Sequence, residues 1–93
     1  MMQKEKELAE FFKIFAEPAR IRILLALEPG EISVNDLASK LDMNQSSVSH
    51  QLRVLKDHRL VEVRRSGKQK FYRIFDEKIY PFLQQADWYC SRF

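Results

Sequence analysis

The stretch that decides the fold is Leu41–Leu55, which reads LDMNQSSVSHQLRVL. Its first residues break one short helix, and Asn44 is of a type that caps the start of the next. The spacing predicts that this next helix runs from Gln45 to about His58. Its apolar residues share one side, formed by Val48, Leu52 and Leu55. Small polar and basic residues share the opposite side, formed by Ser46, Ser49, His50 and Arg53.

Three further helices are expected upstream. The first covers residues 3–16, where apolar residues recur at helical spacing: Leu8, Phe11, Phe12 and Phe15. Pro18 suits the first position of a second, very apolar helix over residues 19–27, which Glu28-Pro29-Gly30 ends. Ser33 is placed to cap the short third helix that leads into the decisive stretch.

Downstream of the decisive stretch the period changes from 3.6 to 2, which predicts a β-hairpin. Residues 60–63 form one expected strand, Ser66-Gly67 the turn, and residues 70–75 the return strand. A last amphipathic helix is expected to begin near Tyr80. The predicted fold is therefore mainly helical, a single winged helix-turn-helix domain over residues 1–93. It comprises four helices, a two-stranded β-hairpin wing and a C-terminal helix.

Charge is concentrated in one part of the chain. The 16 Lys and Arg and 13 Asp and Glu give a net charge of +3. Between Lys40 and Phe75, nine basic and three acidic residues give a local +6, and the seven basic and ten acidic residues elsewhere give −3. Cations bind phosphates, and short polar side chains on a helix read base edges in the major groove. The sequence therefore predicts a double-stranded DNA partner.

The expected DNA-binding residues lie on the second helix of the helix-turn-helix and on the hairpin. They are Gln45, Ser46, Ser47, Ser49, His50, Arg53, Arg64, Arg65, Lys68 and Lys70. Each feature alone also has a structural explanation, because serines cap helices and charges protect edge strands. Their order and spacing, together with the local charge, favour DNA binding.

Several classes of protein are not expected. The longest uncharged apolar run is Ile23–Leu27, far short of the ~20 residues that span a bilayer. The N-terminus lacks the apolar region of a signal peptide, and a single cysteine indicates a reducing compartment, so a cytoplasmic protein is expected. Two Gly and two His offer little for an enzyme site, and we expect neither an enzyme nor a cofactor.

Three stretches resemble the ArsR/SmtB winged-helix repressors: Phe15–Leu24 (FAEPARIRIL), the decisive stretch, and Leu60–Tyr72 (LVEVRRSGKQKFY). The resemblance covers nearly the whole chain, and its middle stretch is quite specific. It implies a homodimeric transcriptional repressor that leaves its operator when an inducer arrives.

The family's frequent metal sites are not matched. Where the family carries Cys-x-Cys at the start of the third helix, this chain has Ser33 and Asn35, which offer no thiolate. The family's Asp, His, His and Glu of the last helix would fall on Asp76, Lys78, Tyr89 and Arg92. We therefore expect no metal at these sites. The sequence does not identify the small inducer that the resemblance implies.

The aromatic residues indicate a homodimer. Eight of the eleven lie in the two end segments, more than so small a domain easily hides. The expected interface consists of Leu8, Phe11, Phe12, Phe15, Phe82, Leu83, Ala86, Tyr89, Cys90 and Phe93. The alternative is that these residues complete the core of a monomer. A two-fold dimer predicts a palindromic operator with recognition helices one DNA turn (~34 Å) apart.

The sequence leaves two other functions open. A winged helix also serves as a protein-interaction module. Cys90 would make the protein a redox-responsive regulator if its thiol were reactive, whereas its structural role would be that of a small apolar residue.

Overall fold

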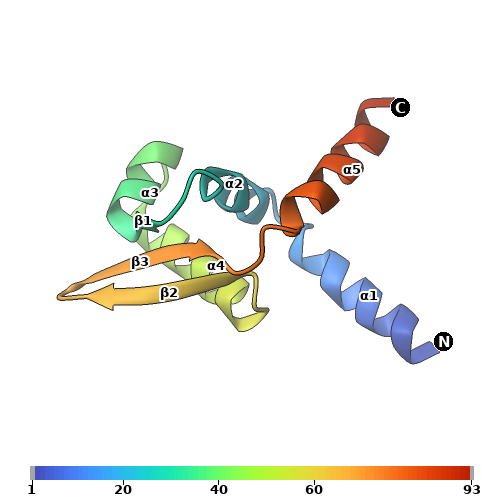
Figure 1. Cartoon of the computed structure of the whole chain (residues 1–93), viewed down its shortest axis with the longest axis horizontal. Coiled ribbons are helices and arrows are strands. Elements are labelled where there is room, and N and C mark those ends of the chain that lie inside the picture. The colour runs from blue at the N-terminus through green and yellow to red at the C-terminus, as the bar shows by residue number, and fades with distance from the viewer. Residues whose placement is uncertain (1, 93) are drawn as a thin grey trace.

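The computed structural model describes residues 2–92 and has the predicted winged helix-turn-helix architecture (Figure 1). The elements are α1 (Met2–Ile14), α2 (Pro18–Ala26), β1 (Ile32–Ser33), α3 (Val34–Leu41), α4 (Gln45–Asp57), β2 (Val61–Ser66), β3 (Gln69–Ile74) and α5 (Ile79–Arg92). Figure 1 shows α2, α3 and α4 gathered beside the strands as a body. From this body α1 and α5 extend as two diverging arms. None of the helices within residues 2–92 has the length and apolar character needed to cross a bilayer.

The core lies between α2, α3, α4 and the inner face of the sheet. Its fully buried large side chains are Ile23, Leu24, Leu27, Leu37, Val48, Leu52 and Leu55. The set includes the whole predicted apolar side of α4, so the spacing argument for that helix is confirmed. The apolar helix α2 is less enclosed than its composition indicates, because Leu25 is 50% exposed.

The sheet has three antiparallel strands in the order β1-β3-β2, whereas the sequence predicts only the two-stranded hairpin. The additional strand is two residues long, and it pairs Ile32 with Tyr72 and Ser33 with Phe71. Two residues are too few to show an alternating pattern. Their pairing fastens the start of α3 to the hairpin.

The turn of the hairpin lies one residue further along than the predicted Ser66-Gly67. Ser66 pairs with Gln69 at the end of the ladder, so Gly67 and Lys68 form the loop. Gly67 has φ +61°, and a positive φ at the first loop residue is the requirement of a type II′ turn, which favours glycine. Both strands reach further toward the tip than predicted, because charged residues on both faces hide the alternation there.

Both predicted caps in the helix-turn-helix are confirmed. The Asp36 amide donates to Ser33 Oγ at 3.1 Å, and the Ser47 amide donates to Asn44 Oδ1 at 2.7 Å. Between the helices, Asp42 adopts a left-handed conformation with φ 52° that ends α3. These local bonds set the angle at which α4 leaves the turn.

Candidate nucleic-acid interface

The side of α4 opposite the core is exposed along the whole helix. Gln45, Ser46, Ser47, His50 and Arg53 are exposed, and Ser49 is half-buried. The Ser46 hydroxyl donates to Asn44 Oδ1 at 3.0 Å and so shares the cap with the Ser47 amide. The first turn of α4 therefore combines a structural cap with an exposed polar surface.

A groove of about 300 Å³ lies between α3, α4 and the wing, by which we mean β2, β3 and their turn. This wing groove is lined by Ser33, Val34, Asn35, Gln45, Ser49, Lys68, Gln69 and Lys70. It brings four of the predicted DNA-binding residues together from two separate elements. Sequence reasoning missed Asn35 and Gln69 as lining residues, because their place follows from the pairing of β1 with β3.

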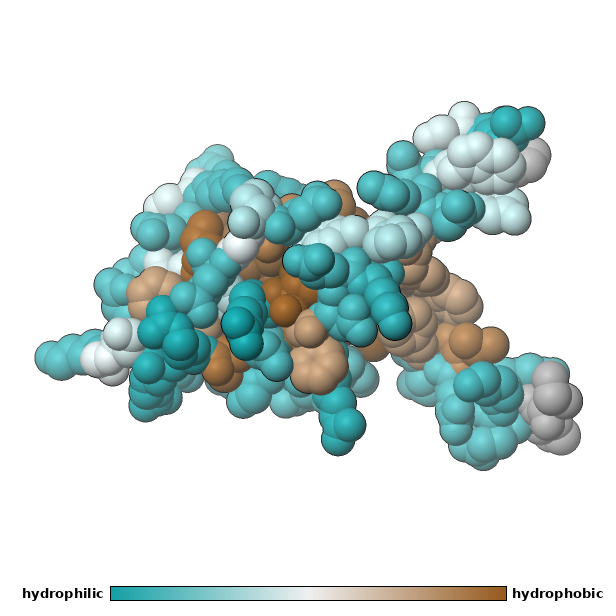
Figure 2. All heavy atoms as spheres, viewed as in Figure 1, coloured by the Kyte–Doolittle hydropathy of each residue, from teal (hydrophilic) through white to brown (hydrophobic). Residues whose placement is uncertain are grey.

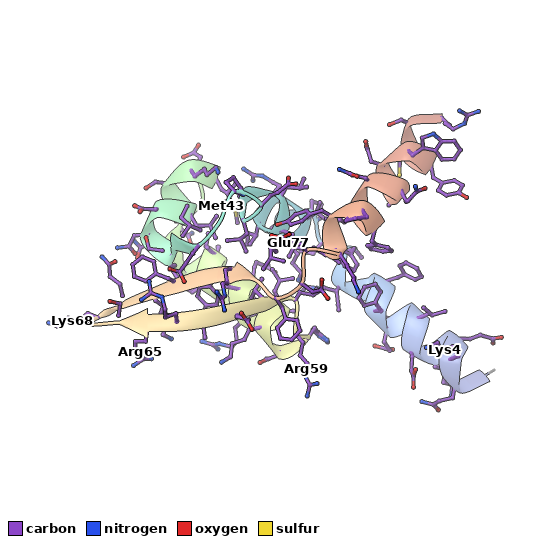
Figure 3. All side chains as sticks on the ribbon, viewed as in Figure 1. Lys4, Met43, Arg59, Arg65, Lys68 and Glu77 are labelled. Atoms are coloured by element: carbon purple, nitrogen blue, oxygen red, sulfur yellow. The ribbon has the colours of Figure 1, made fainter. Side chains whose placement is uncertain are left out.

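The two adjacent wing arginines point in opposite directions. Arg65 pairs with Lys70 across the ladder, and Arg64 pairs with Phe71. Since side chains alternate along a strand, Arg65 lies on the same face as the buried Val61, the face toward the helices. Figure 3 shows the side chains of Arg65 and of Lys68, which lies at the tip of the wing, extending away from the ribbon.

Arg64 is already paired with another side chain of the protein. Its Nη2 lies 2.7 Å from Oε1 of Glu31, and its guanidinium carbon lies 4.8 Å from the centre of the Phe71 ring. The hydrogen bond from Arg64 lowers the pKa of Glu31 and in turn raises the pKa of Arg64. Arg64 was predicted to bind DNA, and the structure places it outside the wing groove in an ion pair.

The remaining predicted cations are differently placed. Within residues 2–92, ion pairs join Lys13 to Glu10, Arg64 to Glu31 and Arg73 to Glu62. Four predicted DNA-binding cations take part in none of these pairs: Arg53, Arg65, Lys68 and Lys70. Arg65 and Lys70 also face each other across the ladder, and like charges in directly opposed positions are unfavourable.

The predicted dimer residues gather where the arms leave the body. The rings of Phe11, Phe12 and Phe15 each lie 5.3–6.1 Å from the ring of Phe82, which joins α1 to α5. Phe12 is nevertheless 53% exposed and Leu8 46%. Figure 2 shows this hydrophobic surface in tan and brown at the base of the arms.

The rest of the predicted interface lies along α5. Leu83 is half-buried, whereas Ala86, Tyr89 and Cys90 are exposed. Phe93 lies outside the described residues. Leu83, Ala86 and Cys90 line a second groove, which α5 forms with Ile21 and Leu25 of α2. In the part of the chain that the structure describes, no three His, Cys, Asp or Glu residues are grouped so as to hold a metal ion.

Comparison with known proteins gives a consistent result. The family described as "Bacterial regulatory protein, arsR family" matches residues 17–63. A transcriptional repressor SmtB homolog of Synechocystis is 40% identical over 91% of this chain, which spans 64% of that relative's length. A biofilm growth-associated repressor of Agrobacterium fabrum is 41% identical over 84% of this chain and 67% of its own.

Solved structures agree with these relatives. The crystal structure of Rv0081 from Mycobacterium tuberculosis has a TM-score of 0.84 and 39% identity, and it covers 95% of this chain and 89% of its own. The solution structure of a homodimeric winged helix-turn-helix fragment from Mycobacterium bovis has a TM-score of 0.81 and 31% identity over 99% and 89% of the two chains. The family consists of DNA-binding regulators rather than enzymes, as the sequence predicted. The chain belongs to the arsR family of bacterial regulatory proteins.

Proposed function

We propose that the protein is a transcriptional repressor that binds an operator through α4 and the wing. The observation that carries this proposal is the wing groove, which joins Gln45 and Ser49 of α4 to Lys68 and Lys70 without any carboxylate in its lining. Short polar side chains bind base edges, and cations without a carboxylate partner bind phosphates, so this groove offers both kinds of contact side by side.

Each element has a distinct role in this proposal. The exposed side of α4 enters the major groove, where Gln45 pairs with adenine and Arg53 with a guanine edge or a phosphate. The wing lies along the adjacent backbone or minor groove. A phosphate placed near Arg65 and Lys70 relieves their mutual repulsion, so DNA binding stabilises an arrangement that is unfavourable in the free protein.

The protein acts as a homodimer in this proposal, paired through its arms. Exposed apolar side chains on α1 and α5 support the pairing, and so does the homodimeric fragment from M. bovis. A two-fold axis between the copies places the α4 helices about one DNA turn (~34 Å) apart on a palindromic site. An inducer, whose identity is not assigned, then releases the protein from the operator.

The experiment is a selection of bound duplexes from a random pool, followed by affinity measurements over a range of salt concentrations. Arg53→Ala is expected to cost ~1–3 kcal/mol on the selected site and to relax its sequence preference. Lys68→Ala is expected to weaken all duplexes alike and to reduce the salt slope by about 1.

Lys4→Ala is the matched control, because Lys4 lies far along the α1 arm from the wing (Figure 3). It is expected to keep both the affinity and the salt slope of the wild type. Binding that does not change between low and moderate salt would contradict the proposed function.

A further inference from the structure

We propose that the wing groove holds one backbone phosphate of each operator half-site, and that Asn35 and Gln69 are contacts of this phosphate. The inference rests on the proposed DNA binding and adds a site to it. It assigns a function to two side chains that neither the spacing of α4 nor the charge of the wing points to.

The chemistry of the lining matches a phosphate. Lys68 and Lys70 supply positive charge, and the other polar groups are neutral hydrogen-bonding side chains, namely Ser33, Asn35, Gln45, Ser49 and Gln69. A phosphate oxygen accepts hydrogen bonds from amide, hydroxyl and ammonium groups alike. No carboxylate lies in the lining to repel it.

Two helices begin at this groove. Val34 and Asn35 are the first residues of α3, and Gln45 is the first residue of α4. The amino end of a helix carries partial positive charge and favours an anion. The first turn of α4 has no acidic residue, whereas that of α3 holds Asp36, so α4 is the helix whose end reinforces the two lysines. The lysines come from the other wall of the groove.

The walls of the groove are fixed relative to one another. Ser33 is only 5% exposed, it caps α3, and it pairs with Phe71 of β3. The same two-residue strand thus holds the start of α3 against the strand that carries Gln69 and Lys70. A site whose groups are already positioned loses less conformational entropy when its ligand arrives.

The lysine side chains indicate a phosphate carried on a duplex rather than an enclosed small anion. Lys68 and Lys70 are exposed, and Lys68 stands at the tip of the wing (Figure 3). An anion in such a site keeps much of its contact with water, so it binds weakly by itself. A phosphate in a duplex is delivered by the other contacts of α4 and the wing, which raises its effective concentration.

The test uses the duplex selected from the random pool and a series of duplexes with one methylphosphonate at successive positions of each half-site. A methylphosphonate removes the charge of a single phosphate. In the wild type, one position that lies against the wing groove is expected to cost ~tenfold in affinity. In Asn35→Asp and Gln69→Glu, which place a carboxylate in the groove, that position is expected to lose its effect, because the contact is already broken.

Gln85→Glu is the control, since it makes the same amide-to-carboxylate change on an exposed residue of α5. It is expected to keep the wild-type pattern of methylphosphonate sensitivity. A pattern in Asn35→Asp and Gln69→Glu that equals the wild-type pattern overturns the phosphate site. Failure of the wild type to bind any duplex overturns the proposed function as well, so the two failures are distinguishable.

A second arm separates DNA phosphate from free phosphate. Wild-type affinity is measured in potassium phosphate and in potassium chloride of matched ionic strength, and the two affinities are expected to agree. Stronger inhibition by inorganic phosphate that disappears in Asn35→Asp would assign the groove to a free anion and overturn its assignment to the DNA backbone.

Discussion

Arg64 and Arg65 are neighbours in β2 that meet different surroundings. Arg64 is bound by Glu31 and lies over the Phe71 ring, whereas Arg65 faces Lys70 across the ladder. An arginine already neutralised by a carboxylate has less to gain from a phosphate than an arginine beside another cation. We therefore expect the two residues to differ in their contribution to DNA binding although they are adjacent in the sequence.

This difference predicts the outcome of two alanine variants. Arg65→Ala is expected to lower the affinity for the selected duplex ~threefold to tenfold at moderate salt and to reduce the salt slope, since one phosphate contact is lost. Arg64→Ala is expected to change both quantities by less. Fluorescence anisotropy at several salt concentrations measures both. Equal salt slopes for the two variants would contradict the assignment of Arg64 to the ion pair.

Tyr80 predicts a pH dependence of stability. Its hydroxyl donates to the Leu24 carbonyl at 2.7 Å. Burial, with the nearby Glu28 and Glu77 carboxylates, raises its pKa to about 12. The folded state thus holds this proton more tightly than the unfolded chain does. The resulting stability is present in full below ~pH 10, the ordinary tyrosine value, and is lost as the pH rises toward 12.

Tyr80→Phe tests this prediction. At pH 8 the variant is expected to be less stable by ~0.5–1.5 kcal/mol, because one hydrogen bond is lost. Between pH 10 and 12 the difference from the wild type is expected to shrink. Urea denaturation at fixed protein concentration, at pH 8 and pH 11, measures it. A difference that stays constant would show that the Tyr80 hydroxyl does not titrate abnormally.

The helix α4 ends in a hydrogen-bonded motif that strains one residue. The Arg59 amide donates to the Lys56 carbonyl and the Leu60 amide donates to the Leu55 carbonyl, both at 2.9 Å. This Schellman arrangement places Arg59 in a left-handed conformation with φ 61°. Such a conformation costs a residue with a Cβ ~1–2 kcal/mol, and only glycine adopts it without that cost.

Arg59→Gly is therefore expected to stabilise the protein. The relief of strain exceeds the ~0.5–1 kcal/mol by which glycine's greater freedom favours the unfolded chain, so a net gain of ~0.5–1 kcal/mol is expected. In a domain of this size that is a rise of several degrees in Tm, at ~4–8 °C per kcal/mol. Lys56→Gly, within the last turn of α4, is the control and is expected to lose ~1 kcal/mol. A lower Tm for Arg59→Gly contradicts the motif.

Elements defined by local chemistry are those that the sequence predicts well. The caps at Ser33 and Asn44 and the apolar side of α4 depend on residues within one or two turns of each other, and all are as predicted. The strand β1 and the pairing of Glu31 with Arg64 depend on residues that are more than thirty positions apart. No periodicity encodes such contacts. The sequence therefore predicted only four of the eight residues that line the wing groove, which depends on β1.

For the whole molecule, the positive charge is separated from the rest within the body. The segment with a local +6 contains α4 and the wing, whereas the arms α1 and α5 each hold as many acidic as basic residues, so the −3 comes from the residues between these parts. The sequence shows this separation directly. It does not show that the aromatic residues of α1 and α5 pack only in part on each other, because exposure depends on where the arms leave the body.

The exposed part of that aromatic cluster predicts where the two copies of the dimer meet. Phe12 stacks on Phe82 at 6.1 Å yet remains 53% exposed, so a glutamate there leaves the buried core of the body intact. A charge buried without a partner in a dimer interface costs several kcal/mol. Phe12→Glu is therefore expected to be monomeric by sedimentation at micromolar concentration, while the wild type is dimeric.

Phe75→Glu is a matched control, because Phe75 is 54% exposed directly after β3 and outside the aromatic cluster of the arms. It is expected to remain a dimer. The monomeric Phe12→Glu is expected to bind the selected palindrome ~10²–10⁴-fold more weakly, since the second half-site no longer adds to the first, and to bind an isolated half-site as the wild type does. If Phe12→Glu sediments as a dimer, the two copies pair through another surface, and the spacing of the half-sites must then follow from that surface instead of from the arms.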